Sequence, residues 1–222
     1  MLITEQLHLL LLRPDGRGES SAWSYRAYGE VAAVIVDLAL AGRLTVTEEK
    51  RPVVHVVSPA PTGHPVLDAA LARLAPLSGR RLGSLVSRSA LDPKDEVIAS
   101  LIAQGVLGHG ERGFFGLGAE RTPEAEPHTE GAIRARLAAV LAGTTAPQPS
   151  DLTLLSILQA MNAAHSILRV ESGGLSAARL KKRIAELVES SAVGDAVSGA
   201  VNAVIVAVMT ASLIPVMIAA TN

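Results

Sequence analysis

Residues 36–58, VDLALAGRLTVTEEKRPVVHVVS, join an apolar helix to a β-hairpin through one glycine. The helix is predicted to run from about Ser21 to Ala41, with Gly42 just beyond its end, where a left-handed residue commonly closes a helix. Two runs rich in β-branched residues then flank the polar stretch EEKRP, which predicts a hairpin over residues 44–58. The architecture is therefore built from helices that feed small β-ribbons.

The same plan recurs later in the chain. LIAQGVLGH, residues 101–109, ends a second helix, and GHGERGFFGLGAERTP predicts a second hairpin over residues 108–123. Further helices are expected after Thr4, from Pro65, over residues 78–90 and after Asp92, where Asp92 is the expected N-cap and Pro93 the first helical residue. Three more are expected over residues 130–143, 150–168 and 176–190. We predict a mainly α-helical, single-domain bundle over residues 1–222 with two small β-hairpins.

Composition limits the functional classes. The chain has 222 residues, a formal net charge of -1 and no cysteine, so disulfides and thiolate chemistry are excluded. Without a strong net charge, attraction to nucleic acid or anionic lipid has to come from a local patch. The N-terminus has no basic region before its apolar run, which argues against a signal peptide, and we expect a cytoplasmic protein.

The C-terminal stretch SGAVNAVIVAVMTASLIPVMIAATN, residues 198–222, is long enough to span a bilayer as a helix. No charged residue follows Asp195, but the stretch contains small and polar residues and Pro215, and it has no aromatic residue at either end. Membrane spans are usually flanked by aromatic or basic side chains. We therefore expect a buried hairpin, or a helix kinked near Pro215, rather than a membrane anchor.

The sequence shows no catalytic motif. GHGERG satisfies the letter of the dinucleotide-binding fingerprint, but a helical pattern precedes it where a strand is required. The histidines have no metal-ligand spacing, and His165 is expected to be a core residue on an apolar helix. We expect neither an enzyme, nor a metal site, nor a cofactor.

Aromatic residues are rare and grouped. Trp23, Tyr25 and Tyr28 crowd one helix start, and the only two phenylalanines, Phe114 and Phe115, are adjacent in the second hairpin. Trp23 is either a core anchor or an interfacial ring at a lipid headgroup. Adjacent strand residues point to opposite faces, so one phenylalanine is free for a membrane or another protomer unless a covering helix buries both.

Several segments, taken in order, resemble the Golgi phosphoprotein 3 family. They are TEQLHLLLL with the RPDG turn, Trp23, VDLALAGRLTV, SPAPTGHPVLDAAL, DEVIASLIAQGVL and ERTPEAEP. The resemblance implies a helical peripheral membrane protein that binds phosphatidylinositol 4-phosphate in a basic pocket, serves as an adaptor for membrane-protein clients, and uses its hairpin for oligomerisation and membrane contact.

The same resemblance implies candidate headgroup residues. Trp23 matches the family's tryptophan, Arg26 is a nearby substitute for an arginine that has no counterpart, and Lys94 stands where the first of a group of arginines is expected. Asp95 and Glu96 follow Lys94, which departs from the family pattern. Further basic charge is expected from Arg80, Arg81 and Arg88 if they fold toward Trp23, although a solvated helix face is the alternative.

Two other functions compete with membrane binding. A helix followed by a hairpin also occurs in winged-helix DNA-binding regulators, but EVAAVIVDLALAG has no basic residue and DPKDEVIASLIAQG has one against three acids. Such helices repel DNA, so we expect no nucleic-acid partner. A scaffold that assembles only with proteins is not separated from a membrane-binding module by the sequence.

Overall fold

A computed structural model describes the chain except residues 14, 48–50, 109–122, 124, 126 and 192–222. The predicted fold class is confirmed: the protein is mainly helical with a small antiparallel sheet. The longer helices are α1 (Ile3–Leu10), α3 (Arg26–Leu40), α4 (Pro65–Leu74), α6 (Lys94–Ala103), α7 (Pro127–Ala142), α8 (Pro149–Ala160) and α10 (Ala177–Ser191). The shorter ones are α2 (Ser20–Trp23), α5 (Leu82–Val86), α9 (Ala164–Ile167) and the 3-10 turns η1 (Ala75–Leu77) and η2 (Ser89–Leu91).

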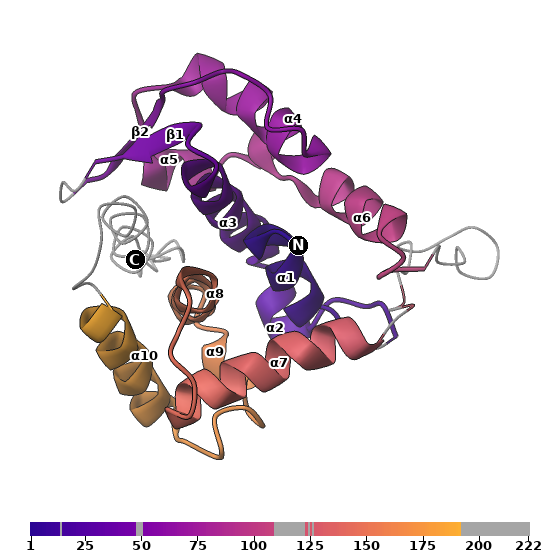
Figure 1. Cartoon of the computed structure of the whole chain (residues 1–222), viewed down its shortest axis with the longest axis vertical. Helices are drawn as coiled ribbons and strands as arrows, with labels where there is room; N and C mark the ends of the chain where they lie inside the picture. The colour runs from indigo at the N-terminus through magenta and orange to yellow at the C-terminus, as the bar shows by residue number, and fades with distance from the viewer. Residues whose placement is uncertain (14, 48–50, 109–122, 124, 126, 192–222) are drawn as a thin grey trace, which may run out of the picture.

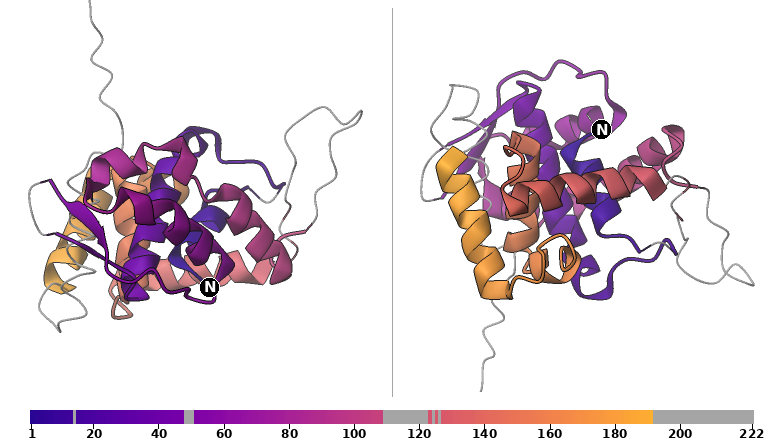
Figure 2. Two further views of the ribbon diagram at one scale, coloured as in Figure 1. Left: turned by 90° about the horizontal axis from the view of Figure 1, so that it is seen from above. Right: turned by 60° about the horizontal axis from the view of Figure 1, so that its bottom comes forward.

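Helix α3 is the central element of the bundle. It is buried along most of its length and packs against α1, α4, α5 and α8 (Figure 1). α7 crosses α1 and α8, and α10 lies against α8 and α9 (Figure 2). The buried apolar side chains form one cluster to which both the first and the last of these helices contribute.

A carboxylate inside this cluster fixes the start of the chain. Asp37 of α3 accepts the backbone N–H groups of Ile3 and Thr4 at 2.9 and 3.0 Å and the Thr4 hydroxyl at 2.6 Å. It therefore satisfies N–H groups that the first turn of α1 leaves without an intrahelical partner. Burial raises the pKa of Asp37, and the hydrogen bonds from Thr4 and Ile3 only partly offset that effect.

The predicted junction between helix and hairpin is confirmed. Gly42 has a φ of +67°, and the N–H groups of Gly42 and Arg43 donate to Ala39 and Leu38, which is the Schellman end of a helix. Strand β1 (Leu44–Val46) pairs antiparallel with β2 (Val53–Val56). A short strand, β3 (Arg80–Arg81), adds to the other edge of β2.

Four expected helices differ from the structure in their bounds. The helix expected over residues 150–168 is divided into α8 and α9. The helix expected over residues 21–41 is broken after Trp23 into α2 and α3. The helix expected over residues 78–90 is reduced to α5, because its first residues pair with the sheet as β3. α6 begins at Lys94 with Pro93 as its N-cap, so the expected boundary was wrong by one residue, although the Asp92 side chain does accept the Lys94 N–H at 3.1 Å.

The second hairpin is described only at its ends. The Gly108 N–H donates to the carbonyl oxygen of Pro123 at 2.9 Å, and the Ala125 N–H donates to that of Val106 at 2.9 Å. The backbone at residues 106–108 therefore lies beside the backbone at residues 123–125. Phe114 and Phe115 lie outside the described residues, as does the C-terminal stretch with Pro215. Among the residues that the structure does describe, no helix has the length and apolar character that crossing a membrane requires.

Candidate functional site

Trp23, the only tryptophan, is half-buried at the end of α2 and is held from several directions. The Arg26 guanidinium lies 5.4 Å from the ring centroid, and the His8 ring meets the indole edge-on at 5.7 Å with an interplanar angle of 65°. The backbone of Gly18 approaches so closely that a Cβ at this position would lie 2.0 Å from the ring. The indole therefore has a fixed orientation.

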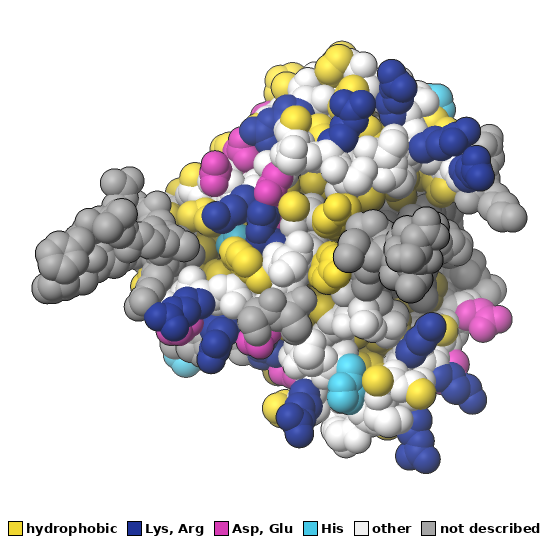
Figure 3. All heavy atoms as spheres, turned by 180° about the vertical axis from the view of Figure 1, so that it is seen from behind, with side chains coloured by type: hydrophobic (Ala, Val, Ile, Leu, Met, Phe, Trp, Pro, Cys, Tyr) yellow, Lys and Arg dark blue, Asp and Glu magenta, His cyan; other side chains and the backbone are white. Residues whose placement is uncertain are grey.

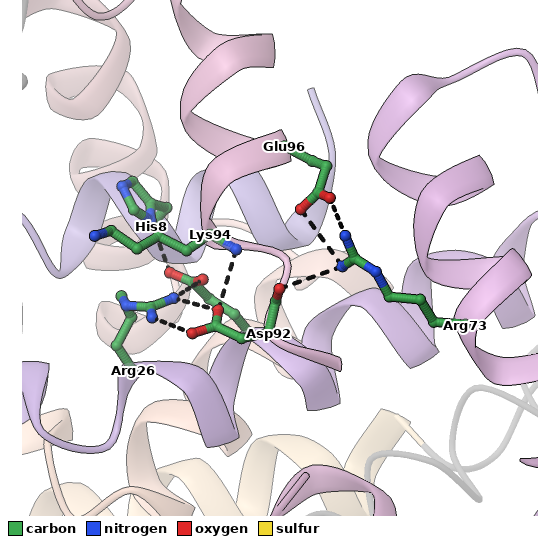
Figure 4. Close-up of polar contacts among 7 residues, drawn as sticks. His8, Arg26, Arg73, Asp92, Lys94 and Glu96 are labelled. Carbon is green, nitrogen blue, oxygen red and sulfur yellow. Dashed lines mark hydrogen bonds and ion pairs between the residues drawn. The ribbon is translucent and has the colours of Figure 1, made fainter. Parts of the chain in front are cut away.

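Arg26, in the first turn of α3, lies between two carboxylates. Its Nη1 and Nη2 atoms donate to the two oxygens of Asp92 at 2.8 and 2.5 Å, and Nη1 also donates to Glu30. The Arg26 side chain is only 8% exposed. Such a two-pronged contact is the geometry in which a guanidinium binds a carboxylate or a phosphate, and here Asp92 already occupies it (Figure 4).

Asp92 and Lys94 lie at the start of α6. Burial acts to raise the pKa of Asp92, but hydrogen bonding and charge from Arg26, together with the N–H and ammonium of Lys94, outweigh it and hold that pKa below its usual value. The Lys94 side chain extends over the same side as Arg26 and His8 (Figure 4). It is half-exposed, and within the described part of the chain no ion pair engages its ammonium.

His8 of α1 completes a group of side chains, with Trp23, Arg26, Glu30, Asp92 and Lys94, that we call the Trp23 cluster. The His8 side chain has no exposed surface. Its Nδ1 lies 2.7 Å from Glu30 Oε1, while its Nε2 is buried without a hydrogen-bond partner in the described residues. Sequence reasoning did not place His8 in the site, and it did not pair Glu30 with Arg26. The spacing of Arg26 and Glu30 by four residues was an available signal, because such residues share one helix face.

A second ion pair secures the neighbouring helix. Arg73 of α4 donates to Glu96 of α6 and, at 3.3 Å, to the carbonyl oxygen of Asp92 (Figure 4). This pair fixes α4 against the start of α6. Glu96, predicted to weaken anion binding next to Lys94, is thus engaged with an arginine outside the Trp23 cluster.

Arg80, Arg81 and Arg88 do not join the Trp23 cluster through any contact among the described residues. Arg80 and Arg81 form β3, and Arg88 precedes η2, with all three side chains exposed. None of the three takes part in an ion pair with another described residue. Figure 3 shows Lys and Arg side chains over the upper part of this face, to which α4, α5 and the sheet belong, and over its lower part as well.

The expectation that His165 is a core residue was wrong. His165 is exposed on α9 rather than buried, and it lines a hollow of about 220 Å³ together with Gln159, Asn162 and Lys181. The helix there is only four residues long, so the apolar pattern that placed His165 in the core breaks down. Within the described part of the chain, no three histidine or acidic side chains converge as metal ligands.

The arrangement of α3 bears on the winged-helix alternative. A recognition helix has to present side chains to a DNA groove. α3, which precedes the β1–β2 hairpin, is instead enclosed by α1, α4, α5 and α8.

Comparison with known proteins gives one family. The family model described as Golgi phosphoprotein 3 (GPP34) matches residues 3–208. No curated protein matches the chain significantly. The matched range includes the Trp23 cluster and the exposed arginines of residues 80–88.

Proposed function

The chain belongs to the Golgi phosphoprotein 3 family, and from that premise we propose that it is a non-enzymatic peripheral protein that binds anionic phospholipid at a membrane surface. Trp23 and Lys94 are the headgroup residues in this proposal. Arg80, Arg81 and Arg88 supply the longer-range attraction. Adaptor contacts with membrane proteins belong to the same proposal, as does oligomerisation through the second hairpin.

One observation carries the proposal: basic side chains that make no ion pair with a described residue lie in the chain segment that also contacts the cluster around Trp23. Arg80, Arg81, Arg88 and Lys94 lie within residues 80–94, which run from the sheet to the start of α6. Asp92 of the same stretch bonds Arg26, whose guanidinium lies over Trp23. Amphipathic indoles suit the headgroup region of a bilayer, and unpaired arginines suit an anionic surface.

Arg26 is the weakest part of the headgroup assignment that the resemblance implies. Its side chain is almost fully buried, and both terminal nitrogens are engaged by carboxylates. Direct contact with a phosphate requires one carboxylate to leave. We therefore assign Arg26 to the orientation of Trp23 and give the direct charge contact to Lys94.

Co-sedimentation with vesicles tests the proposal. Phosphatidylcholine vesicles with and without phosphatidylglycerol are mixed with the wild type and with the triple variant Arg80→Gln/Arg81→Gln/Arg88→Gln. Each basic residue near an anionic surface contributes about 1 kcal/mol, so the triple variant should bind roughly 100-fold more weakly. Because the three side chains are exposed and make no ion pair with a described residue, the variant should remain folded.

The matched control removes the same charge elsewhere. Arg179→Gln/Lys181→Gln/Lys182→Gln alters three exposed cations of α10 and should retain most of the binding. Equal losses in the two triple variants would show a general charge effect and refute the location. No binding of the wild type to anionic vesicles would refute the function itself.

A further inference from the structure

The charges around Trp23 do not favour a highly charged ligand. Arg26 and Lys94 are the cations of the cluster, and Glu30 and Asp92 are its carboxylates. These four formal charges cancel. Among the described residues, Lys94 is the cation of the cluster that makes no ion pair, so a ligand does not meet the pair of arginine forks that suits a phosphate with two charges.

Asp92 is the residue that closes the arginine fork. Its two oxygens accept hydrogen bonds from Nη1 and Nη2 of Arg26 in the planar arrangement that two phosphate oxygens otherwise adopt. Asp92 is also held by the Lys94 N–H at 3.1 Å, and the carbonyl oxygen of the same residue accepts a hydrogen bond from Arg73. These bonds anchor Asp92 on both sides, so it does not swing away freely when a ligand approaches.

We propose that Asp92 sets the headgroup specificity of this site, because it occupies the fork of Arg26 and leaves the single charge of Lys94 to bind the singly charged phosphodiester of a glycerophospholipid. A phosphomonoester, which carries about two negative charges near neutral pH, meets Asp92 and Glu30 as like charges. The phosphodiester of phosphatidylglycerol needs only Lys94 and the indole. This specificity rests on the proposed membrane binding and narrows its ligand to one chemical class.

The experiment compares two anionic lipids at equal nominal surface charge. Vesicles of phosphatidylcholine contain either phosphatidylglycerol, a phosphodiester, or phosphatidylinositol 4-phosphate, which adds a phosphomonoester. Wild-type protein should bind the second kind no more tightly than the first. Asp92→Asn keeps the size of the side chain, removes its charge and weakens its hold on Arg26, so affinity for the phosphomonoester vesicles should rise roughly five- to tenfold.

A control variant separates site chemistry from net charge. Glu96→Gln removes one negative charge from the same helix, but from the Arg73 pair and not from the Arg26 pair. It should leave the ratio of the two affinities unchanged. If Glu96→Gln raises phosphomonoester binding as much as Asp92→Asn does, the assignment to Asp92 is overturned.

The remaining outcomes are distinct from one another. A wild-type preference for the phosphomonoester vesicles overturns the specificity while membrane binding stands, and this comparison needs no variant to fold. Absence of binding to both vesicles overturns the membrane function together with the specificity. Release of wild-type protein from phosphatidylglycerol vesicles by inorganic phosphate at constant ionic strength identifies a site for free phosphate and overturns the lipid assignment.

Discussion

Replacing Gly18 by alanine tests whether Trp23 is held in place by its surroundings. A Cβ at residue 18 would lie 2.0, 2.2 and 2.5 Å from three atoms of the indole, far inside van der Waals contact. Gly18 does not have a positive φ, so the backbone itself accepts alanine. Any destabilisation should therefore come from the contact with Trp23.

The magnitude follows from the two ways in which the clash is relieved. If the turn and the ring stay close, the extra methyl group overpacks the contact at a cost of about 1–3 kcal/mol. If the ring moves away, it loses its contacts with His8 and Arg26, which are worth about 0.5–1.5 kcal/mol each. Either route lowers the free energy of unfolding by roughly 1–3 kcal/mol.

Urea denaturation followed by circular dichroism measures this loss, and the emission of Trp23 reports the change in its environment without labelling. Gly83→Ala is the control: nothing lies within 4 Å of a Cβ there, and residue 83 is inside α5. Alanine inside a helix is favoured over glycine by about 0.5–1 kcal/mol, so this variant should be unchanged or more stable. A Gly18→Ala protein with wild-type stability and wild-type Trp23 emission would refute the close contact between residue 18 and the indole.

Three further substitutions test other contacts. Asp92→Asn should lower the free energy of unfolding by about 1–2 kcal/mol at neutral pH. Because folding lowers the pKa of Asp92, the stabilisation by its carboxylate is complete above the ordinary pKa of a carboxyl group and is lost as pH falls through the lowered pKa of the folded state. Urea denaturation should therefore show the stability advantage of the wild type narrowing in acid, and a constant advantage would contradict this. Gly29→Ala places a Cβ 2.4 Å from the Met161 sulfur and should lower the free energy of unfolding by about 1–3 kcal/mol. Thermal melts should show partial recovery when Met161→Ala is added, because the smaller side chain relieves the contact. Additive effects of the two substitutions would contradict this. Thr4→Val removes a hydroxyl donor from buried Asp37 and should lower the urea-derived stability by about 1–2 kcal/mol, a result contradicted by an unchanged midpoint.

The elements that sequence reasoning predicted well depend on local chemistry. Gly42 closes α3 because a left-handed residue is needed at that point, and the polar EEKRP stretch separates two runs that pair as β1 and β2. Pro65 is likewise found in the first turn of α4. In each case residues a few positions apart contain the whole signal, so one sequence suffices.

The site depends on contacts that no local pattern contains. Arg26 and Asp92 are 66 residues apart, and only the packing of α3 against the segment before α6 brings them together. The approach of Gly18 to Trp23 depends on the turn after α1 and on the break between α2 and α3, which the helical pattern did not reveal. For the same reason Arg26 was predicted as a headgroup ligand without the two carboxylates that engage it.

Emission from Trp23 during a vesicle titration tests the membrane proposal at the site itself. Wild-type protein is titrated with vesicles of phosphatidylcholine alone and with vesicles that also contain phosphatidylglycerol. We expect a saturable change in the emission of this half-buried indole with the anionic vesicles only, and a weaker one after Lys94→Ala. An emission spectrum that stays the same with both kinds of vesicle, while the protein remains folded, would show that Trp23 does not meet lipid and that the proposed headgroup site is wrong.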